Sequence, residues 1–269
     1  MKQLYCGDNV TLMRQHLPDE CVDLTVTSPP YDNLRTYNGY EWDFESLAKE
    51  LWRVTKRGGV VVWVVGDATV NGSETGTSFR QALFFMQCGF NMHDTMIWEK
   101  PHFANPSSNR CHQIFEYMFV FSKGVPKTFN QIRDVPIKYG KPFGKTSLRK
   151  QNGEIVNSET VRESQDEFGG RKNIWKINTV GQESVGKKQA HPAAFSEQLA
   201  HDHIVSWSNE WDVVFDPFMG SGTTGVAALQ TNRVFIGMDI SDEYVQMSRL
   251  RIDTSVNKPH ALPNSTAKE

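Results

Sequence analysis

The sequence predicts an α/β protein built around one mostly parallel sheet. Runs of β-branched residues alternate along the chain with segments of helical spacing, and the run 60–65 is apolar throughout, as is typical of a strand covered on both faces. The stretch 213–239 predicts a strand, a glycine-rich turn, a helix and a second strand that ends in Asp239. A chain of 269 residues is long enough for one large domain, with or without an insertion.

The first half of the chain alternates strands and helices. We expect a surface loop at 32–41, because this segment is polar and contains glycine, and we expect Arg57-Gly58-Gly59 to end the second helix. Strands are predicted at 2–6, 22–26, 60–65, 92–98 and 115–122, and helices at 9–17, 44–54 and 78–89.

The pattern changes after Lys123. Residues 123–188 are basic, contain glycine and are only weakly periodic, with Phe168 and Trp175 as isolated aromatic residues, so we interpret them as an irregular insertion. The alternation then resumes, with helices predicted at 195–207, 226–229 and 244–250, strands at 213–215 and 234–238, and a polar tail after residue 254.

Charge is distributed unevenly along the chain. The formal net charge is −2, but residues 123–188 hold 14 Lys and Arg against 7 Asp and Glu. A basic segment in an otherwise acidic protein favours a nucleic-acid partner over a merely solvated surface. The four cysteines have no metal-ligand spacing and no apolar run is long enough to span a membrane, so we expect a reduced cytoplasmic protein without a metal.

Two motifs stand at predicted strand ends. Ser28-Pro29-Pro30-Tyr31 follows the second strand, and its prolines hold the carbonyl groups in set directions beside a flat ring, which suits a planar group that carries an amine. The segment 216–224 follows a later strand, and its Gly220 and Gly222 allow close approach of a ligand. No lysine follows these glycines, so an adenosine-type ligand is favoured over a nucleoside triphosphate.

Together these motifs resemble the amino-group DNA methyltransferases that use S-adenosylmethionine, in the circularly permuted arrangement called the β class, and most closely the cytosine-N4 members. The resemblance spans most of residues 1–254. It implies a Rossmann-like methyltransferase fold whose mostly parallel sheet carries an antiparallel hairpin strand. It divides the chain into a catalytic half (1–122), a target-recognition insertion (123–188), a cofactor-binding half (189–254) and a polar tail (255–269).

The resemblance also implies roles for individual residues. The catalytic set is Ser28, Pro29, Pro30 and Tyr31. The cofactor-binding set is Asp8, Phe195, Asp216, Pro217, Phe218, Gly220, Ser221, Gly222, Thr223 and Asp239, where Asp239 accepts from ribose hydroxyls. The candidate DNA-binding residues are Arg149, Lys150, Arg171 and Lys172.

The implied reaction is direct in-line transfer of the sulfonium methyl group to an exocyclic amine of a base flipped out of duplex DNA. Carbon-5 methylation is excluded because no cysteine lies in the catalytic loop. Serine at position 28 favours cytosine N4, and adenine N6 is the alternative. A non-catalytic nucleic-acid-binding module, an RNA methyltransferase and a small-molecule methyltransferase are further alternatives. The expected partner is double-stranded DNA. The sequence is compatible with a cognate restriction endonuclease and with an enzyme that acts alone as a regulator, and with a monomer and a homodimer.

Overall fold

The structure is a computed structural model of the 269-residue chain. It describes residues 1–30, 42–103, 108–137, 146–150, 152–158, 167–179 and 196–256, with the backbone alone at 146–149, 156–158 and 256. The loop predicted at 32–41 lies outside these residues. The described part divides into two compact units, 1–130 with 173–269 and 131–172, and each is described by itself below.

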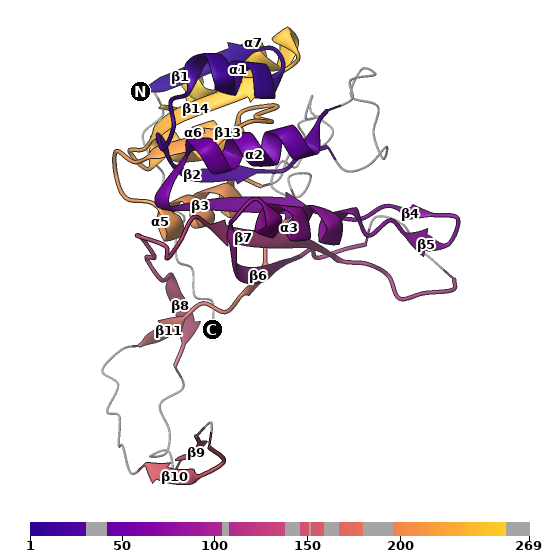
Figure 1. Ribbon diagram of the computed structural model, residues 1–269, viewed down its shortest axis with the longest axis vertical. Helices are drawn as coiled ribbons and strands as arrows, with labels where there is room; N and C mark the ends of the chain where they lie inside the picture. Colours follow the sequence, from indigo (N-terminus) through magenta and orange to yellow (C-terminus); the bar gives the residue numbers. More distant parts are fainter. Residues whose placement is uncertain are drawn as a thin grey trace, which may run out of the picture. The chain divides into compact units, whose positions relative to one another are not determined.

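An eight-stranded sheet forms the centre of the first unit, with the order β1-β14-β13-β2-β3-β7-β6-β12 (Figure 1). Every neighbouring pair is parallel except the two that involve β7, which runs antiparallel to β3 and β6. The strands are β1 (Lys2–Cys6), β2 (Val22–Thr27), β3 (Thr55–Val65), β6 (Asn91–Glu99), β7 (Phe115–Ser122), β12 (Ile174–Lys176), β13 (Val213–Asp216) and β14 (Val234–Asp239). The mostly parallel sheet with its antiparallel strand is therefore confirmed.

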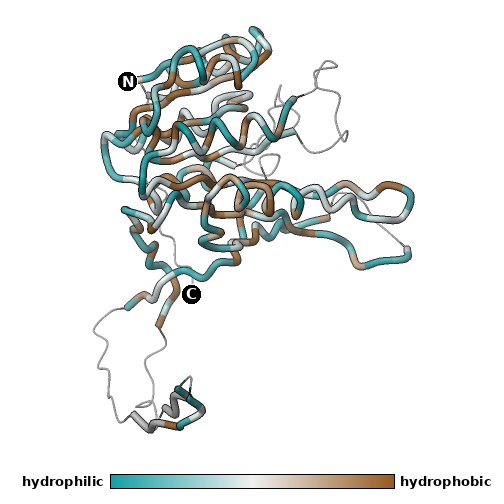
Figure 2. Tube along the Cα trace, viewed as in Figure 1, coloured by the Kyte–Doolittle hydropathy of each residue, from teal (hydrophilic) through white to brown (hydrophobic). Residues whose placement is uncertain are grey.

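Helices cover both faces of this sheet. One apolar cluster joins the sheet to α1 (Asn9–His16), α2 (Phe44–Val54) and α3 (Thr77–Gln87). The other joins the opposite face to α5 (Glu197–Trp207), α6 (Thr223–Gln230) and α7 (Asp242–Val256). Because both faces are buried, β3 carries the apolar run 60–65, and Figure 2 shows brown, hydrophobic segments among the strands of this unit. None of the described helices is both long and apolar enough to cross a membrane.

Two details differ from the sequence predictions. The second helix ends at Val54 and β3 begins at once with Thr55, so Arg57-Gly58-Gly59 lies inside the strand and does not end the helix. Trp175 is not isolated: it belongs to β12, which pairs with β6 at the sheet edge, and its ring stacks on His203 at a centroid distance of 4.5 Å. Glycines often end a helix, so Gly58 and Gly59 led to the wrong boundary. Strand β12 has only three residues, which are too few to show the alternation typical of a strand.

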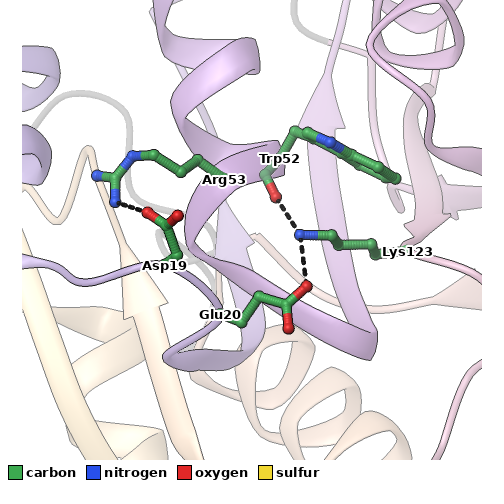
Figure 3. A pocket seen from close by; sticks show the side chains of 5 residues that line it. All are labelled: Asp19, Glu20, Trp52, Arg53 and Lys123. Atoms are coloured by element: carbon green, nitrogen blue, oxygen red, sulfur yellow. Dashed lines mark hydrogen bonds and ion pairs between the residues drawn. The ribbon is translucent and has the colours of Figure 1, made fainter.

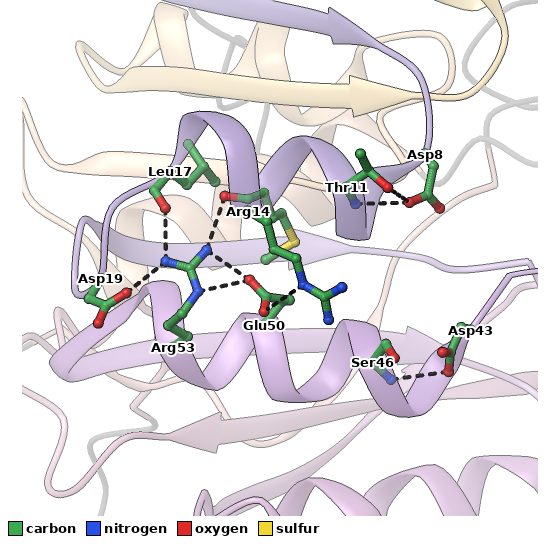
Figure 4. Close-up of polar contacts among 10 residues, drawn as sticks. Asp8, Thr11, Arg14, Leu17, Asp19, Asp43, Ser46, Glu50 and Arg53 are labelled. Carbon is green, nitrogen blue, oxygen red and sulfur yellow. Dashed lines mark hydrogen bonds and ion pairs between the residues drawn. The ribbon is translucent and has the colours of Figure 1, made fainter.

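The first two helices are joined by polar contacts (Figure 4). Arg53 of α2 donates to the carbonyl oxygens of Leu17 (2.9 Å) and Met13 (3.0 Å) at the end of α1, and it pairs with Glu50 and Asp19, each at 2.7 Å. These bonds satisfy carbonyl groups that the end of a helix leaves without partners. They hold α1, and with it the end of β1, against the rest of the layer.

The second unit contains short antiparallel pairs. Strand β8 (Arg133–Pro136) pairs with β11 (Phe168–Gly170), and β9 (Thr146–Arg149) pairs with β10 (Ile155–Ser158). A further two-stranded pair, β4 (Thr69–Val70) with β5 (Ser73–Glu74), belongs to the first unit and follows β3. The sequence did not predict these strands, since each has only two to four residues.

Candidate functional site

The strand ends that carry the two sequence motifs are neighbours in the sheet. Strand β2 ends at Thr27, immediately before Ser28, and β13 ends at Asp216. The two strands pair directly, with Phe215 opposite Thr25. Ser28 and Pro30 are half-buried and Pro29 is buried, while Tyr31 lies outside the described residues.

The carboxylate of Asp216 connects the two motifs by hydrogen bonds. Its Oδ1 accepts from Thr27 Oγ1 (2.7 Å) and from the backbone N–H of Phe218 (3.0 Å), and its Oδ2 accepts from Thr224 Oγ1 (2.8 Å). Asp216 is 2% exposed, and Thr27 and Thr224 are fully buried. A sequence motif predicted to bind cofactor thus uses its first side chain to hold the strand that leads to Ser28.

Burial dominates the protonation of Asp216. It raises the pKa of this carboxyl from 3.8 to about 6, although the hydrogen bonds from Thr27, Thr224 and Phe218 act in the opposite direction, and the charge of Asp239 adds a smaller upward contribution. A buried carboxylate is tolerated here because three donors converge on it.

Asp239 lies at the end of β14, two strands from β2. Its Oδ2 accepts from the backbone N–H of Gly220 and its Oδ1 from that of Ser241, both at 2.9 Å. Burial raises the pKa of Asp239, and these backbone bonds oppose the change. Its backbone carbonyl accepts from the N–H of Gly7 at 2.9 Å, which brings the end of β1 to the same edge.

The glycine loop between β13 and α6 is tightly packed. Gly222 has a φ of +80°, and a Cβ built on it would lie 2.7 Å from Cβ of Ser248 on α7. The loop is also tied to β14, because the N–H of Met219 donates to the carbonyl of Met238 at 2.9 Å. Only glycine combines this backbone conformation with this proximity.

Arg251 of α7 donates hydrogen bonds to the glycine loop and to the start of α6. Its Nη1 donates to Ser221 Oγ (2.9 Å), Ser221 O (3.2 Å) and Thr223 Oγ1 (3.1 Å), and its Nη2 donates to Glu197 Oε1 (2.5 Å) at the start of α5. The hydroxyl groups of Ser221 and Thr223 therefore serve this contact, and any cofactor contact they make beyond it remains a prediction.

Other predicted cofactor residues lie around this edge in different settings. Asp8 is exposed and caps α1, accepting from Thr11 N (2.8 Å) and Thr11 Oγ1 (2.6 Å) (Figure 4). Pro217 is buried, and its carbonyl accepts from Asn9 Nδ2 at 3.4 Å. Phe218 is half-buried and meets Trp42 edge to face, with the ring centroids 5.0 Å apart. Phe195 lies outside the described residues.

The four candidate DNA-binding residues lie in the second unit. Lys150 is exposed and pairs with Glu154 at 3.5 Å, and Arg171 is half-buried and forms an ion pair with Asp134. Lys172 is exposed, and the side chain of Arg149 lies outside the described residues. The pair of Lys150 with Glu154 is exposed on both sides, and surface pairs of this kind contribute little to stability.

A charged pocket of about 500 Å³ lies elsewhere, where β2 begins and β7 ends (Figure 3). Lys123 in this pocket donates to Trp52 O at 2.9 Å and pairs with Glu20 at 3.2 Å, and Arg53 pairs with Asp19. These charges satisfy one another. In parallel sheets ligands bind at the carboxyl ends of the strands, whereas this pocket lies at the amino ends, so we assign it no role in the site.

Sequence reasoning missed several residues that organise the site. Thr27, Thr224, Asn9 and Arg251 all contact the two motifs or the glycine loop, yet none was singled out. The available signal was the position of the two threonines, each beside a predicted strand end or helix start. The distant Arg251 offered no signal, because its contact depends on how α7 packs.

Comparison with known proteins agrees with this geometry. The model of the N6/N4 DNA methylase family matches residues 22–250. The orphan methyltransferase M.BamHII of Bacillus amyloliquefaciens is 56% identical over 244 residues, which cover 89% of this chain and 92% of that protein. The DNA adenine methyltransferase YhdJ of Escherichia coli strain K12 is 26% identical, covering 94% of this chain and 83% of that protein.

Solved structures show the same fold. The PvuII DNA methyltransferase, described as cytosine-N4-specific, has a TM-score of 0.68 at 24% identity and covers 98% of this chain and 87% of that one. TTHA0409 of Thermus thermophilus, described as a putative DNA modification methylase and complexed with S-adenosyl-L-methionine, has a TM-score of 0.65 at 23% identity and covers 96% and 95%. With a family match over residues 22–250 and a relative of 56% identity, the chain belongs to the N6/N4 family of DNA methyltransferases.

Proposed function

We propose that this protein transfers a methyl group from S-adenosyl-L-methionine to the exocyclic N4 amine of cytosine in duplex DNA. The observation that carries the proposal is the Asp216 contact to Thr27, because it holds the strand end before Ser28 beside the glycine loop. The base choice rests on serine at position 28.

The edge formed by β1, β14 and β13 suits an adenosine-type cofactor. The loop 217–222 has a tight backbone with glycines at positive φ, and the half-buried Asp239 carboxylate stands beside it. Asp239 would accept from the ribose hydroxyls through the lone pairs that Gly220 and Ser241 leave available. When bound, S-adenosyl-L-methionine supplies a methyl group on a positively charged sulfur.

The base-binding loop acts on the amine that receives this methyl group. An exocyclic amine is a poor nucleophile, because its lone pair is delocalised into the ring. The Ser28 hydroxyl and the Pro29 carbonyl would each accept a hydrogen bond from one N–H of the amine. These two bonds would turn the nitrogen lone pair toward the methyl carbon and stabilise the positive charge that develops on the nitrogen. Tyr31 would stack on the base, which leaves the duplex to reach this edge.

Adenine N6 is the second candidate, and one observation favours it: the relative from Escherichia coli is named a DNA adenine methyltransferase. Both amines need the same pair of acceptors, so the same loop serves either base. Serine in place of aspartate at position 28 leads us to place cytosine first.

The proposed partner is double-stranded DNA, bound through Arg149, Lys150, Arg171 and Lys172 in the second unit. The relative from Bacillus amyloliquefaciens is named an orphan methyltransferase, and on that ground we propose an enzyme that acts without a paired restriction endonuclease. The four cysteines are all free, which suits the reducing cytoplasm where DNA of a bacterial cell lies.

Product analysis tests the proposal directly. The protein is incubated with unmethylated DNA and isotope-labelled S-adenosyl-L-methionine, the DNA is digested to nucleosides, and the labelled nucleoside is identified by mass spectrometry. We expect N4-methylcytosine. N6-methyladenine would replace the base assignment while keeping the reaction, and label in RNA alone would overturn the DNA assignment. No label in either nucleic acid would favour a non-catalytic binding module.

A further inference from the structure

Two threonines and one aspartate join the predicted base-binding loop to the predicted cofactor loop. Asp216 Oδ1 accepts from both the hydroxyl of Thr27 and the N–H of Phe218, so one oxygen contacts the strand that leads to Ser28 and the first turn of the glycine loop. Asp216 Oδ2 accepts from Thr224, which lies in the first turn of α6. The three side chains are at most 2% exposed, so water does not compete for these bonds.

Each of these side chains is placed to act through others. Asp216 was predicted to bind cofactor, but both its oxygens are occupied by protein donors in the interior. Thr27 precedes the first base-binding residue by one position, and its hydroxyl donates across the sheet edge to Asp216. Thr224 Oγ1 also lies 3.2 Å from the carbonyl oxygen of Val26, so it contacts the same strand a second time.

We propose that Thr27, Asp216 and Thr224 form a positioning network that sets the distance between the amine-binding groups at Ser28 and the methyl donor held by loop 217–222. This inference rests on the proposed methyl transfer and deepens it. Reactions of this kind lose about 10²-fold in rate when the reacting groups are misplaced by about 1 Å, so a network that holds both loops has direct consequences for turnover.

The chain contains a matched control for this network. Thr25 lies two residues before Thr27 on the same strand, so its side chain points to the same face, and it is equally buried. Among the described residues its hydroxyl finds no hydrogen-bond partner. Thr25→Val and Thr27→Val therefore make the same chemical change at neighbouring positions, but only the second removes a bond to Asp216.

The experiment compares Thr27→Val, Thr25→Val and Thr27→Ser in the full chain. We expect Thr27→Val to lower kcat and weaken S-adenosyl-L-methionine binding, each by about 3- to 30-fold, a range typical of substitutions that act through a coupled network. Thr25→Val should change neither quantity by more than about twofold, and Thr27→Ser, which keeps the hydroxyl, should restore both. Urea unfolding shows that each variant is folded at the assay temperature.

Two readouts keep the inference separate from the proposed function. Calorimetry of cofactor binding needs no DNA and no turnover, so it tests the positioning role of the network even if the wild-type protein methylates no base. Weaker cofactor binding in Thr27→Val but not in Thr25→Val supports the network, since Thr27 lies on the base-binding strand. If Thr27→Val matches Thr25→Val in both cofactor binding and kcat, the network has no positioning role and the proposal is overturned.

Discussion

Ser28 follows the end of β2 and Asp239 ends β14, and substitutions at these two positions have different expected effects. Replacing Ser28 by alanine removes one acceptor for the amine, so we expect kcat to fall by about 10²-fold, as when one preorganised polar contact to a transition state is lost. Cofactor affinity should change little, because Ser28 follows β2 and not the glycine loop. Single-turnover kinetics and calorimetry measure the two quantities separately.

Asp239→Ala should act in the opposite way. The substitution removes the predicted ribose acceptor and also the acceptor for the N–H groups of Gly220 and Ser241, so the loop loses support as well. We expect cofactor binding to weaken by about 10- to 100-fold, the loss typical of a charge-assisted hydrogen bond. Calorimetry that showed normal binding in Asp239→Ala and lost binding in Ser28→Ala would mean that the two halves of the site are reversed.

The buried carboxyl of Asp216 makes stability depend on pH. Its pKa is about 6 in the folded protein against 3.8 in an open chain, so between these pH values the folded state keeps a proton that the unfolded state has released. The free energy of unfolding contributed by this group therefore falls as the pH rises from about 3 to 7, by about 3 kcal/mol in all.

Asp216→Asn isolates this effect, since asparagine keeps the shape and cannot ionise. The unfolding free energy of Asp216→Asn relative to the wild-type protein should rise between about pH 4 and pH 7. Urea titrations of both proteins at several pH values measure it, and other titrating groups cancel in the difference. Parallel pH curves for the two proteins would contradict the shifted pKa.

At the scale of elements, the turn between β13 and α6 depends on a contact with α7. Gly222→Ala introduces a Cβ 2.7 Å from Cβ of Ser248, in a backbone conformation that disfavours side chains. We expect a loss of about 2 to 4 kcal/mol, the sum of left-handed strain and overpacking. Weaker cofactor binding should accompany it, because the loop must shift.

Gly72→Ala serves as the control for that prediction. Gly72 has a similar φ of +82°, in the turn between β4 and β5, but a Cβ there would meet nothing within 4 Å. This variant should lose only the strain, about 1 to 2 kcal/mol, and should bind cofactor normally. Equal losses in the two variants would show that packing against α7 contributes nothing.

The elements show how far sequence alone leads. Long apolar strands and capped helices were predictable, since β2, β3 and β14 follow their β-branched runs and α2 begins after its cap Asp43. Strand β12 was missed because three residues in a basic segment carry no period. The contact of Asp216 with Thr27 was also not predicted, since a sequence motif names a residue but not the strand it contacts.

At the scale of the whole molecule, the two units differ in net charge. Residues 131–172 hold nine Lys and Arg against six Asp and Glu, although the chain as a whole carries −2. If this unit neutralises DNA phosphates, the affinity for DNA should fall steeply with salt, and each phosphate contact should add about −0.9 to the slope of log K against log salt.

Lys150→Ala tests this expectation against Lys49→Ala. Both lysines are exposed and each pairs with a glutamate four residues away, but Lys49 lies on α2 of the first unit. Losing Lys150 should reduce the salt slope by about 1, whereas losing Lys49 should leave it unchanged. Equilibrium DNA binding at several salt concentrations gives both slopes, and identical slopes would remove Lys150 from the DNA-binding set.

The pairing of β2 with β13 has a consequence during protein synthesis. Thr27 and its partner Asp216 are 189 residues apart in the chain, so at ordinary elongation rates about 10 to 40 s pass between the emergence of the two strands from the ribosome. Over that interval the edge of β2 that later pairs with β13 has no partner strand, and an unpaired strand edge favours aggregation. The folding of newly made chains should therefore depend on chaperones, or on a low growth temperature, far more than the stability of the finished enzyme does.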